Sequence, residues 1–341
     1  MKTNRQTDEK AFISRRHFLK AAVAGGAVSA AAISGTVLLT QDAYAAATFI
    51  AAVNRYADSL QEFMQKGFKE LGLTRKNISG KKILLKPNLV EPHMGAGHIN
   101  THPLVVRAAI DTFLHLGASA IVVAEGSGHR SDALYILEET GLADILTEDK
   151  IPFVDLNKAD IFLAKNQGGR TKMSHFLLPL ELIKADIIVS MAKMKTHHWT
   201  GATLSMKNLF GLMPGAYYGW PKNVLHVAGI QECILDINST VQPQIAIVDG
   251  IVGMEGDGPI MGTPIDSGVL VMGRNLPAVD ATCARIMGLN PGKIDYLKYA
   301  ADTIGPIEED LIEQRGETIE RVRKPYLLLD KIPAHRGLRL I

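Results

Sequence analysis

The sequence contains few cysteines, with only Cys233 and Cys283 in 341 residues. The common iron–sulfur clusters are held by four cysteine thiolates, so the sequence predicts no such cluster on this chain. The two residues fall in predicted helices far apart in the sequence, and we expect two buried free thiols. One disulfide stays open as an alternative, because spacing alone does not show proximity. Any role in electron transfer would therefore require a differently held carrier or a redox partner.

An excess of positive charge is also absent once residues 1–45 are set aside. That segment holds six of the 37 Lys and Arg residues and three of the 35 Asp and Glu residues, so the remainder of the chain is close to neutral. Proteins that bind nucleic acid or anionic membranes usually carry a basic surplus or a basic stripe. We therefore expect no nucleic acid partner, and each lysine cluster has to be interpreted locally.

Familiar nucleotide-binding and nucleophile motifs are missing as well. The glycine-rich loop 253–259 has neither the Walker nor the Rossmann spacing, and no serine has the context of a nucleophile elbow. The glycines of this loop allow either a tight turn with positive φ angles or a ligand site built around Glu255 and Asp257. If the chain is an enzyme, its chemistry depends on lysine, histidine and acidic side chains.

The first 45 residues have the pattern of an export signal. Ser14 to Lys20 form a twin-arginine motif, an uncharged run rich in Ala, Gly and Ser follows, and Ala43-Tyr44-Ala45 offers a cleavage site. The pattern predicts a cleaved Tat signal peptide over 1–45, with an uncleaved N-terminal anchor as the alternative. It implies that the Tat translocase is a partner and that the folded protein acts in the periplasm.

The remaining chain, 46–341, predicts a single α/β domain whose helices cover both faces of a mainly parallel sheet. Apolar runs bounded by turn residues alternate with amphipathic segments, which is typical of βαβ units. A β-hairpin insertion, over 161–164 and 173–178, interrupts the alternation. We expect strands at 82–86, 120–124, 187–191, 245–248 and 268–272, helices at 56–71, 103–116, 131–140, 226–241 and 277–288, and a helical C-terminal region, 289–341, with a strand candidate at 326–329.

A dense polar stretch, 193–211, follows the buried strand predicted at 187–191. Helical spacing over 200–210 would place Thr200, Thr203, Lys207 and Asn208 on one face and apolar residues on the other. A Gly-, Pro- and aromatic-rich segment without periodicity, 212–224, then predicts a long loop over the site.

An ordered series of motifs resembles the domain of unknown function 362 family. The series includes Lys86-Pro87-Asn88, Thr101-His102-Pro103, Lys195-Thr196-His197, the segment from Ser205 to Gly211, and the segment from Asp249 to Pro259. The resemblance covers roughly 81–288 and implies an α/β domain. Some relatives carry ferredoxin-type cysteine motifs, which this sequence lacks, and the family implies no reaction.

Ligands of open parallel sheets bind beyond the carboxyl ends of the strands. Lysine, asparagine and glycine amides suit a carboxylate or a phosphate, and carboxylates suit a divalent cation. The candidate catalytic residues are Lys195, His197 and Lys207; the candidate substrate-binding residues are Lys86, Asn88, Lys193, Thr196, Asn208, Gly256 and Gly258; the candidate metal ligands are Glu125, Asp249 and Glu255.

Three classes of function fit these predictions. The first is an exported enzyme acting on a small anionic molecule, with or without the assistance of a divalent metal. The second is a non-catalytic protein that binds a ligand or metal, and the third is an accessory subunit of a periplasmic redox system. Each lysine also has the plain alternative of a solvated position at a strand end.

Overall fold

The computed structural model describes residues 46–57, 59–92, 95–128 and 132–340. The predicted Tat signal, residues 1–45, lies outside the described residues. Within the described ranges, no helix combines the length and the apolar character needed to cross a membrane.

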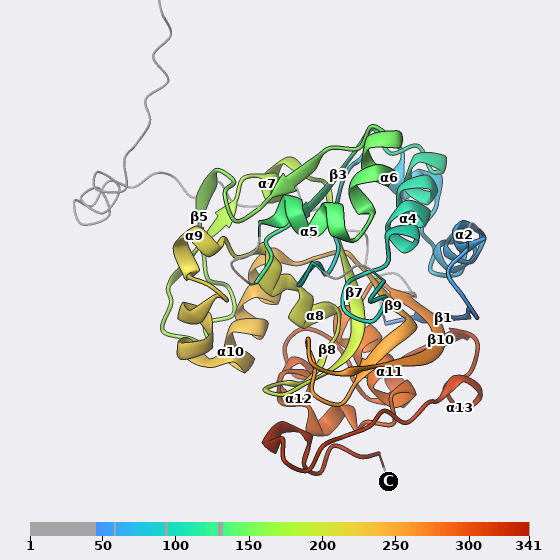
Figure 1. The fold of residues 1–341 in the computed structure, drawn as a ribbon, viewed down its shortest axis with the longest axis vertical. Helices are drawn as coiled ribbons and strands as arrows, with labels where there is room; N and C mark the ends of the chain where they lie inside the picture. Colours follow the sequence, from blue (N-terminus) through green and yellow to red (C-terminus); the bar gives the residue numbers. More distant parts are fainter. Residues whose placement is uncertain (1–45, 58, 93–94, 129–131, 341) are drawn as a thin grey trace, which may run out of the picture. The chain divides into compact units, whose positions relative to one another are not determined.

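A nine-stranded mixed sheet forms the centre of the described chain (Figure 1). Its strand order is β11-β1-β10-β9-β7-β2-β3-β4, and β8 pairs with β7 outside this path. The strands are β1 (Thr48–Ala52), β2 (Lys82–Lys86), β3 (Ala120–Glu125), β4 (Phe153–Asp155), β7 (Ile187–His197), β8 (Gly201–Thr203), β9 (Ile245–Glu255), β10 (Thr263–Gly273) and β11 (Gln314–Gly316).

The strands from β9 to β4 run parallel to one another, which confirms the predicted sheet. Antiparallel β10 follows β9 at one side, and β1 lies antiparallel against β10. Because β9, β7, β2 and β3 are parallel neighbours, their carboxyl ends lie at the same edge of the sheet. The strands β1, β4, β8 and β11 were not predicted; each is five residues long or shorter.

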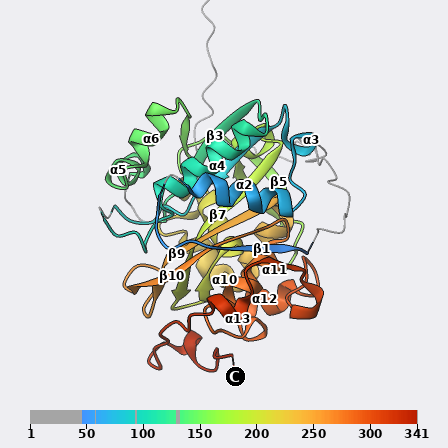
Figure 2. The ribbon, with the colours of Figure 1, turned by 90° about the vertical axis from the view of Figure 1, so that its right-hand side faces the viewer.

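Helices pack on both faces of the sheet, as predicted (Figure 2). Ile83 and Leu85 contact one apolar cluster and Leu84 contacts the other, since side chains alternate along a strand. The first face is covered by α2 (Leu60–Glu70), α3 (Arg75–Ile78), α4 (Pro103–His115), α5 (Ala133–Glu139) and α6 (Leu142–Glu148); the second is covered by α8 (Ser205–Asn208), α10 (Asn223–Val241), α11 (Leu276–Ile286) and α12 (Asp295–Ala300).

The predicted hairpin insertion is confirmed. β5 (Ile161–Lys165) and β6 (His175–Pro179) form a separate two-stranded antiparallel sheet. The turn between them is bound by Asp236 of α10, whose carboxylate accepts hydrogen bonds from the N–H groups of Arg170 and Thr171. The insertion is therefore attached to the helix that covers the second face.

Short elements complete the described chain, and they include the C-terminal region. They are α7 (Glu181–Lys184), η1 (Leu209–Leu212), α9 (Gly215–Tyr218), η2 (Pro291–Lys293), η3 (Glu309–Leu311), α13 (Ile319–Val322) and η4 (Pro333–His335). The strand expected at 326–329 is wrong, because Leu327 pairs instead with the glycine-rich loop through Gly256 and the Glu255 side chain. Cys233 and Cys283 are buried free thiols, as predicted.

The helix expected over 200–210 is also wrong in its first half. β7 continues to His197, and a turn closed by hydrogen bonds from the N–H groups of Trp199 and Thr200 to His197 Nδ1 leads into β8. Gly201 has a φ of +78°, a conformation that favours glycine, and this reversal lets β8 pair antiparallel with β7. Only Ser205–Asn208 is α-helical.

Asp280 of α11 holds the start of this short helix. Its carboxylate accepts hydrogen bonds from the N–H groups of Ser205 and Met206, at 2.8 and 3.0 Å, and from the Ser205 hydroxyl at 2.5 Å. Burial raises the pKa of Asp280 to about 7, although these donors oppose the shift. The position of Lys207 and Asn208 thus depends on a side chain from a distant helix.

Asp280→Ala should lower the free energy of unfolding by about 2–4 kcal/mol, because it leaves buried donors without an acceptor. Asp280→Asn keeps one acceptor oxygen and should cost less. Denaturant unfolding of both variants measures the difference, and equal losses would contradict the proposed role of the carboxylate.

Candidate functional site

A cavity of about 280 Å³ opens at the carboxyl ends of β2, β3 and β7. Residues from four other segments close it: β8 with α8, the region from Phe210 to Gly211, the region from Pro221 to His226, and the end of the glycine-rich loop. The predicted loop over the site therefore does contribute to its wall, through Pro221 and Lys222. This is the edge of the sheet at which ligands were expected.

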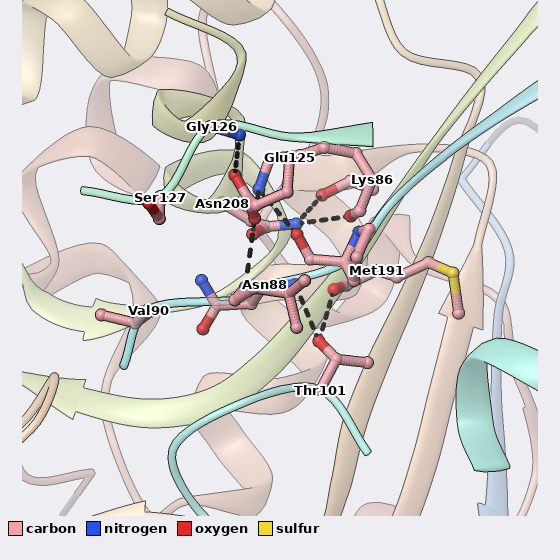
Figure 3. A network of polar contacts seen from close by, with 12 residues as sticks. Lys86, Asn88, Val90, Thr101, Glu125, Gly126, Ser127, Met191 and Asn208 are labelled. Carbon is pink, nitrogen blue, oxygen red and sulfur yellow. Dashed lines mark hydrogen bonds and ion pairs between the residues drawn. The ribbon is translucent and has the colours of Figure 1, made fainter. Parts of the chain in front are cut away.

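A buried ion pair between Lys86 and Glu125 lies in the wall of the cavity (Figure 3). Lys86 Nζ is 2.6 Å from Glu125 Oε2 and 2.8 Å from Asn208 Oδ1, and it also donates to the carbonyl oxygen of Pro87. Glu125 accepts further hydrogen bonds from the N–H groups of Leu89 and Gly126. The pair links the ends of β2 and β3 to α8, and both charges are compensated.

Gly211 permits this ion pair to approach the backbone of η1. A Cβ atom at this position would overlap Glu125 Oε1 and the end of the Lys86 side chain. The Gly211 carbonyl oxygen also accepts a hydrogen bond from the Gly126 N–H at 3.0 Å. Glycine is required here for close approach, not for a positive φ angle.

A second buried ion pair joins Lys193 of β7 to Asp249 of β9, with 2.8 Å between Nζ and Oδ2. Tyr56 completes it, because its hydroxyl accepts from Lys193 Nζ at 2.7 Å and donates to Asp249 Oδ1 at 3.0 Å. Neither Lys193 nor Asp249 lines the cavity. The structure therefore gives Lys193, a candidate for substrate binding, a pairing role between two strands.

Lys195 is as deeply buried as Lys86 and Lys193, but no described carboxylate pairs with it. Among the described residues, its Nζ makes one hydrogen bond, of 3.3 Å, to the carbonyl oxygen of Pro259. Burial, together with the charges of Lys193, Lys207 and Lys86, holds the pKa of Lys195 well below its ordinary value. Lys195 is one of the residues that line the cavity, and the lowered pKa favours the neutral form of its amine.

Two further lysines reach the cavity from the second face. Lys207 of α8 is partly exposed, and its Nζ lies 4.1 Å from the centre of the Phe210 ring. Lys222 is buried and donates to Asn157 Oδ1. Burial lowers the pKa of Lys207 to about 8 and that of Lys222 to about 7.

Three histidines lie along the same wall. His197 Nδ1 accepts two backbone hydrogen bonds, so its neutral ring carries the proton on Nε2. Burial and the nearby Lys207 hold the pKa of His197 well below its ordinary value. His226 contacts the Trp199 ring, and its Nδ1 faces the carbonyl oxygen of Lys222 at 3.0 Å. His198 lies 3.8 Å from Asp257 at the more exposed side.

Two buried polar atoms in the cavity wall have no hydrogen-bond partner among the described residues. They are Asn88 Oδ1 and Thr203 Oγ1. A buried polar group without a partner costs about 1–3 kcal/mol, so such groups are uncommon unless something else satisfies them. Their position supports a ligand with polar groups of its own.

Several other predicted substrate-binding residues have structural roles. The Thr196 hydroxyl donates to the carbonyl oxygen of Gly256 at 2.8 Å, and the His198 N–H donates to that of Gly258 at 3.0 Å. A Cβ atom at Gly258 would overlap the Thr196 carbonyl oxygen. None of Thr196, Gly256 and Gly258 lines the cavity. They hold the glycine-rich loop against β7, so that its next residues, from Pro259 to Met261, can reach the cavity.

The three predicted metal ligands do not form one site. Glu125 is bound by Lys86, Asp249 by Lys193, and Glu255 accepts a hydrogen bond from the Leu327 N–H. Across the described part of the chain, no group of three or more His, Cys, Asp and Glu side chains is placed to hold a metal ion. The sequence placed all three near strand ends but did not reveal that each already has a partner.

The structure thus brings together seven residues of the predicted set at the cavity: Lys86, Asn88, Glu125, Lys195, His197, Lys207 and Asn208. It adds Lys222, His226, Trp199 and Thr203, of which Lys222 contributes a charge that sequence reasoning missed. The sequence did contain a signal for Lys222, because this lysine lies in 212–224, the segment predicted to form a loop over the site.

The fold and the site define an α/β protein with a lysine-lined cavity at the carboxyl edge of its sheet. Residues 83–285 match the family model described as Domain of unknown function (DUF362). The chain belongs to this family, which confirms the resemblance carried by its motifs.

One similar protein is the thylakoid-associated protein sll1697 of Synechocystis sp. It is 28% identical over 226 residues, which cover 63% of this chain and 65% of that protein. The chain therefore spans less than two thirds of that relative's length.

Two solved structures share a distant likeness. The lactate racemase apoprotein from Thermoanaerobacterium thermosaccharolyticum is 12% identical with a TM-score of 0.44, over 71% of this chain and 57% of that chain. A protein from Thermotoga maritima is 14% identical with a TM-score of 0.38, over 68% and 59%. Likeness at this level carries no argument about function.

Replacing Lys86, Lys193 and Lys195 one at a time should lower the free energy of unfolding by different amounts, because only the first two are paired with a carboxylate. Lys86→Met and Lys193→Met each leave a buried carboxylate without its cation and should cost about 3–5 kcal/mol of unfolding free energy. Lys195→Met replaces an unpaired amine by an apolar side chain of similar length and should cost less than about 1.5 kcal/mol. Guanidinium unfolding at neutral pH checks the order, and a loss at Lys195 as large as the other two would contradict this account.

Proposed function

We propose that the cavity binds a small molecule with a carboxylate or phosphate group and that the protein is an enzyme acting on it. One observation carries the proposal: among the described residues, four lysines line the cavity, and the one buried carboxylate in its wall, Glu125, is already paired with Lys86. A second acid in the wall, Asp257, is at the exposed side beside His198. Within the part of the chain that the structure describes, Lys195, Lys207 and Lys222 are thus left without a compensating carboxylate.

An anion would satisfy this arrangement in two ways. It would supply the negative charge that stabilises the ammonium forms of Lys207 and Lys222, whose pKa values are lowered chiefly by burial. It would also accept charge-assisted hydrogen bonds, which are stronger than those between neutral groups. A site that perturbs several titratable groups in one cavity is typical of enzymes, and this supports a catalytic role for Lys195, His197 and Lys207.

Export remains part of the proposal. The twin-arginine motif in residues 1–45 supports recognition by the Tat translocase, and the site would then act in the periplasm.

A partner-binding accessory role is the second candidate. Trp199 and Met261 line the cavity mouth with 53% and 78% of their surfaces exposed, and Val227, next to His226, is 89% exposed. Exposed apolar side chains at one place favour contact with another molecule. Turnover of an isolated small substrate by the purified chain would contradict a purely accessory role.

Lys207→Ala and Lys222→Ala should each weaken anion binding about tenfold or more, since a hydrogen bond to a charged group contributes about 1.5–3 kcal/mol. Isothermal titration with inorganic phosphate and a panel of small carboxylates measures the effect. Lys184→Ala is the matched control, because Lys184 is exposed on α7, pairs with Glu181 and does not line the cavity. Unchanged affinity in both cavity variants would contradict the anion site.

Anion binding should also take up protons at pH 8. Near this pH, Lys207 is about half protonated and Lys222 is mostly neutral, and a bound anion raises both pKa values towards those of ordinary lysines. Affinity should therefore fall as the pH rises through 7 and 8, and the uptake should vanish near pH 5, where both amines are already charged. Titrations in buffers of different ionisation enthalpy measure the uptake, which Lys207→Ala should reduce. A pH-independent affinity between 6 and 9 would argue against the lysines as the anion's partners.

A further inference from the structure

We propose that Lys195 Nζ forms a covalent imine with the carbonyl carbon of the substrate, and that the substrate is a 2-oxo acid. This inference rests on the proposed function, because the carboxylate of such a molecule is the anion that the cavity would bind. It narrows the substrate class from any small anion to one with a ketone or aldehyde carbon beside the carboxylate.

The comparison among the buried lysines is the first support. Lys86, Lys193 and Lys195 each have 0% exposed surface, yet the first two have a carboxylate oxygen at 2.6 and 2.8 Å. Those two amines are each paired with a carboxylate. Lys195 has one long contact to a backbone carbonyl among the described residues, and it is one of the residues that line the cavity.

The charges around Lys195 favour a free lone pair on its nitrogen. Lys193, Lys207 and Lys86 all disfavour a further positive charge, and Glu125 opposes them only weakly because it faces Lys86. A desolvated lysine beside other cations is a general means of producing a nucleophilic amine at neutral pH. The amine is therefore placed and poised to attack an electrophilic carbon that enters the cavity.

Other residues of the cavity wall can bind the carboxylate, the carbonyl oxygen and the apolar remainder of a 2-oxo acid. Lys207 and Lys222 can bind the carboxylate, and the carbonyl oxygen can accept a hydrogen bond from His197 Nε2–H, since His197 Nδ1 already accepts from the backbone. Leu89, Val90 and Phe210 line the apolar part of the same cavity and suit the remainder of the molecule.

The bond changes balance without another reactant. Lys195 Nζ forms a bond to the carbonyl carbon, the carbonyl π pair moves to oxygen, and a proton passes from nitrogen to that oxygen to give a carbinolamine. The carbon–oxygen bond then breaks and the oxygen leaves as water after taking a second proton, for which the Lys207 ammonium is the nearby acid. The product is a protonated imine, which attracts electrons from the adjacent carbon.

Reductive trapping tests the inference directly. The purified full chain is incubated with pyruvate, or with phenylpyruvate to use the apolar wall, and treated with sodium borohydride. We expect one reduced adduct per chain, found by intact-mass analysis and located at Lys195 by peptide mapping. An adduct spread over exposed lysines such as Lys184, or no adduct with either acid, would overturn the inference.

Variants separate this inference from the proposed function. Lys195→Arg places a permanently charged group at this position and Lys195→Met keeps the length of the side chain without the amine, and each should abolish the adduct while pyruvate still binds, as measured by isothermal titration. If the unaltered protein binds pyruvate but forms no adduct, the imine is wrong and the anion site stands. If it binds neither pyruvate, phenylpyruvate nor phosphate, the proposed function fails and the imine with it. Adduct formation that survives both substitutions would assign the nucleophile to another residue.

Discussion

The buried pair of Lys86 and Glu125 is the interaction on which the site depends. It joins the ends of two parallel strands, and through Asn208 it also holds the short helix that carries Lys207. Two buried charges are stable only when each is paired and hydrogen-bonded, and this holds for both Lys86 and Glu125. The pair also requires a glycine at position 211, since a side chain there would overlap Lys86 and Glu125.

The cavity has more lysines than carboxylates, and this imbalance decides its electrostatic properties. Glu125 and Asp249 each compensate one buried lysine, and in the described part of the chain no carboxylate pairs with Lys195. A positive environment without a compensating acid favours neutral amines when the site is empty and ammonium forms when an anion is bound. Anion recognition and amine reactivity are therefore two consequences of the same imbalance.

Much of the fold was predictable because local sequence patterns indicate its strands and helices. The apolar runs at 82–86 and 187–191 and the hairpin insertion could be read from composition and period, and the edge where ligands bind followed from parallel strands. The short strands β1, β4, β8 and β11 were missed because three to five residues show too little periodicity. The helix predicted over 200–210 was wrong in its first half, although the spacing of polar and apolar residues suits a helix. The turn at Gly201 and the pairing of β8 with β7 depend on tertiary contacts that the local spacing does not show.

The sequence by itself determined the family, the α/β class and a lysine- and histidine-rich cluster at the strand ends. Only the tertiary structure decided which lysines have partners. Lys193 and Lys195 lie two residues apart on one strand, yet one faces Asp249 and Tyr56 and the other faces the cavity. The reason is physical: a lysine's chemistry depends on its burial and on the charges within a few ångströms, and the carboxylates that pair with Lys86 and Lys193, Glu125 and Asp249, come from residues far away in the chain.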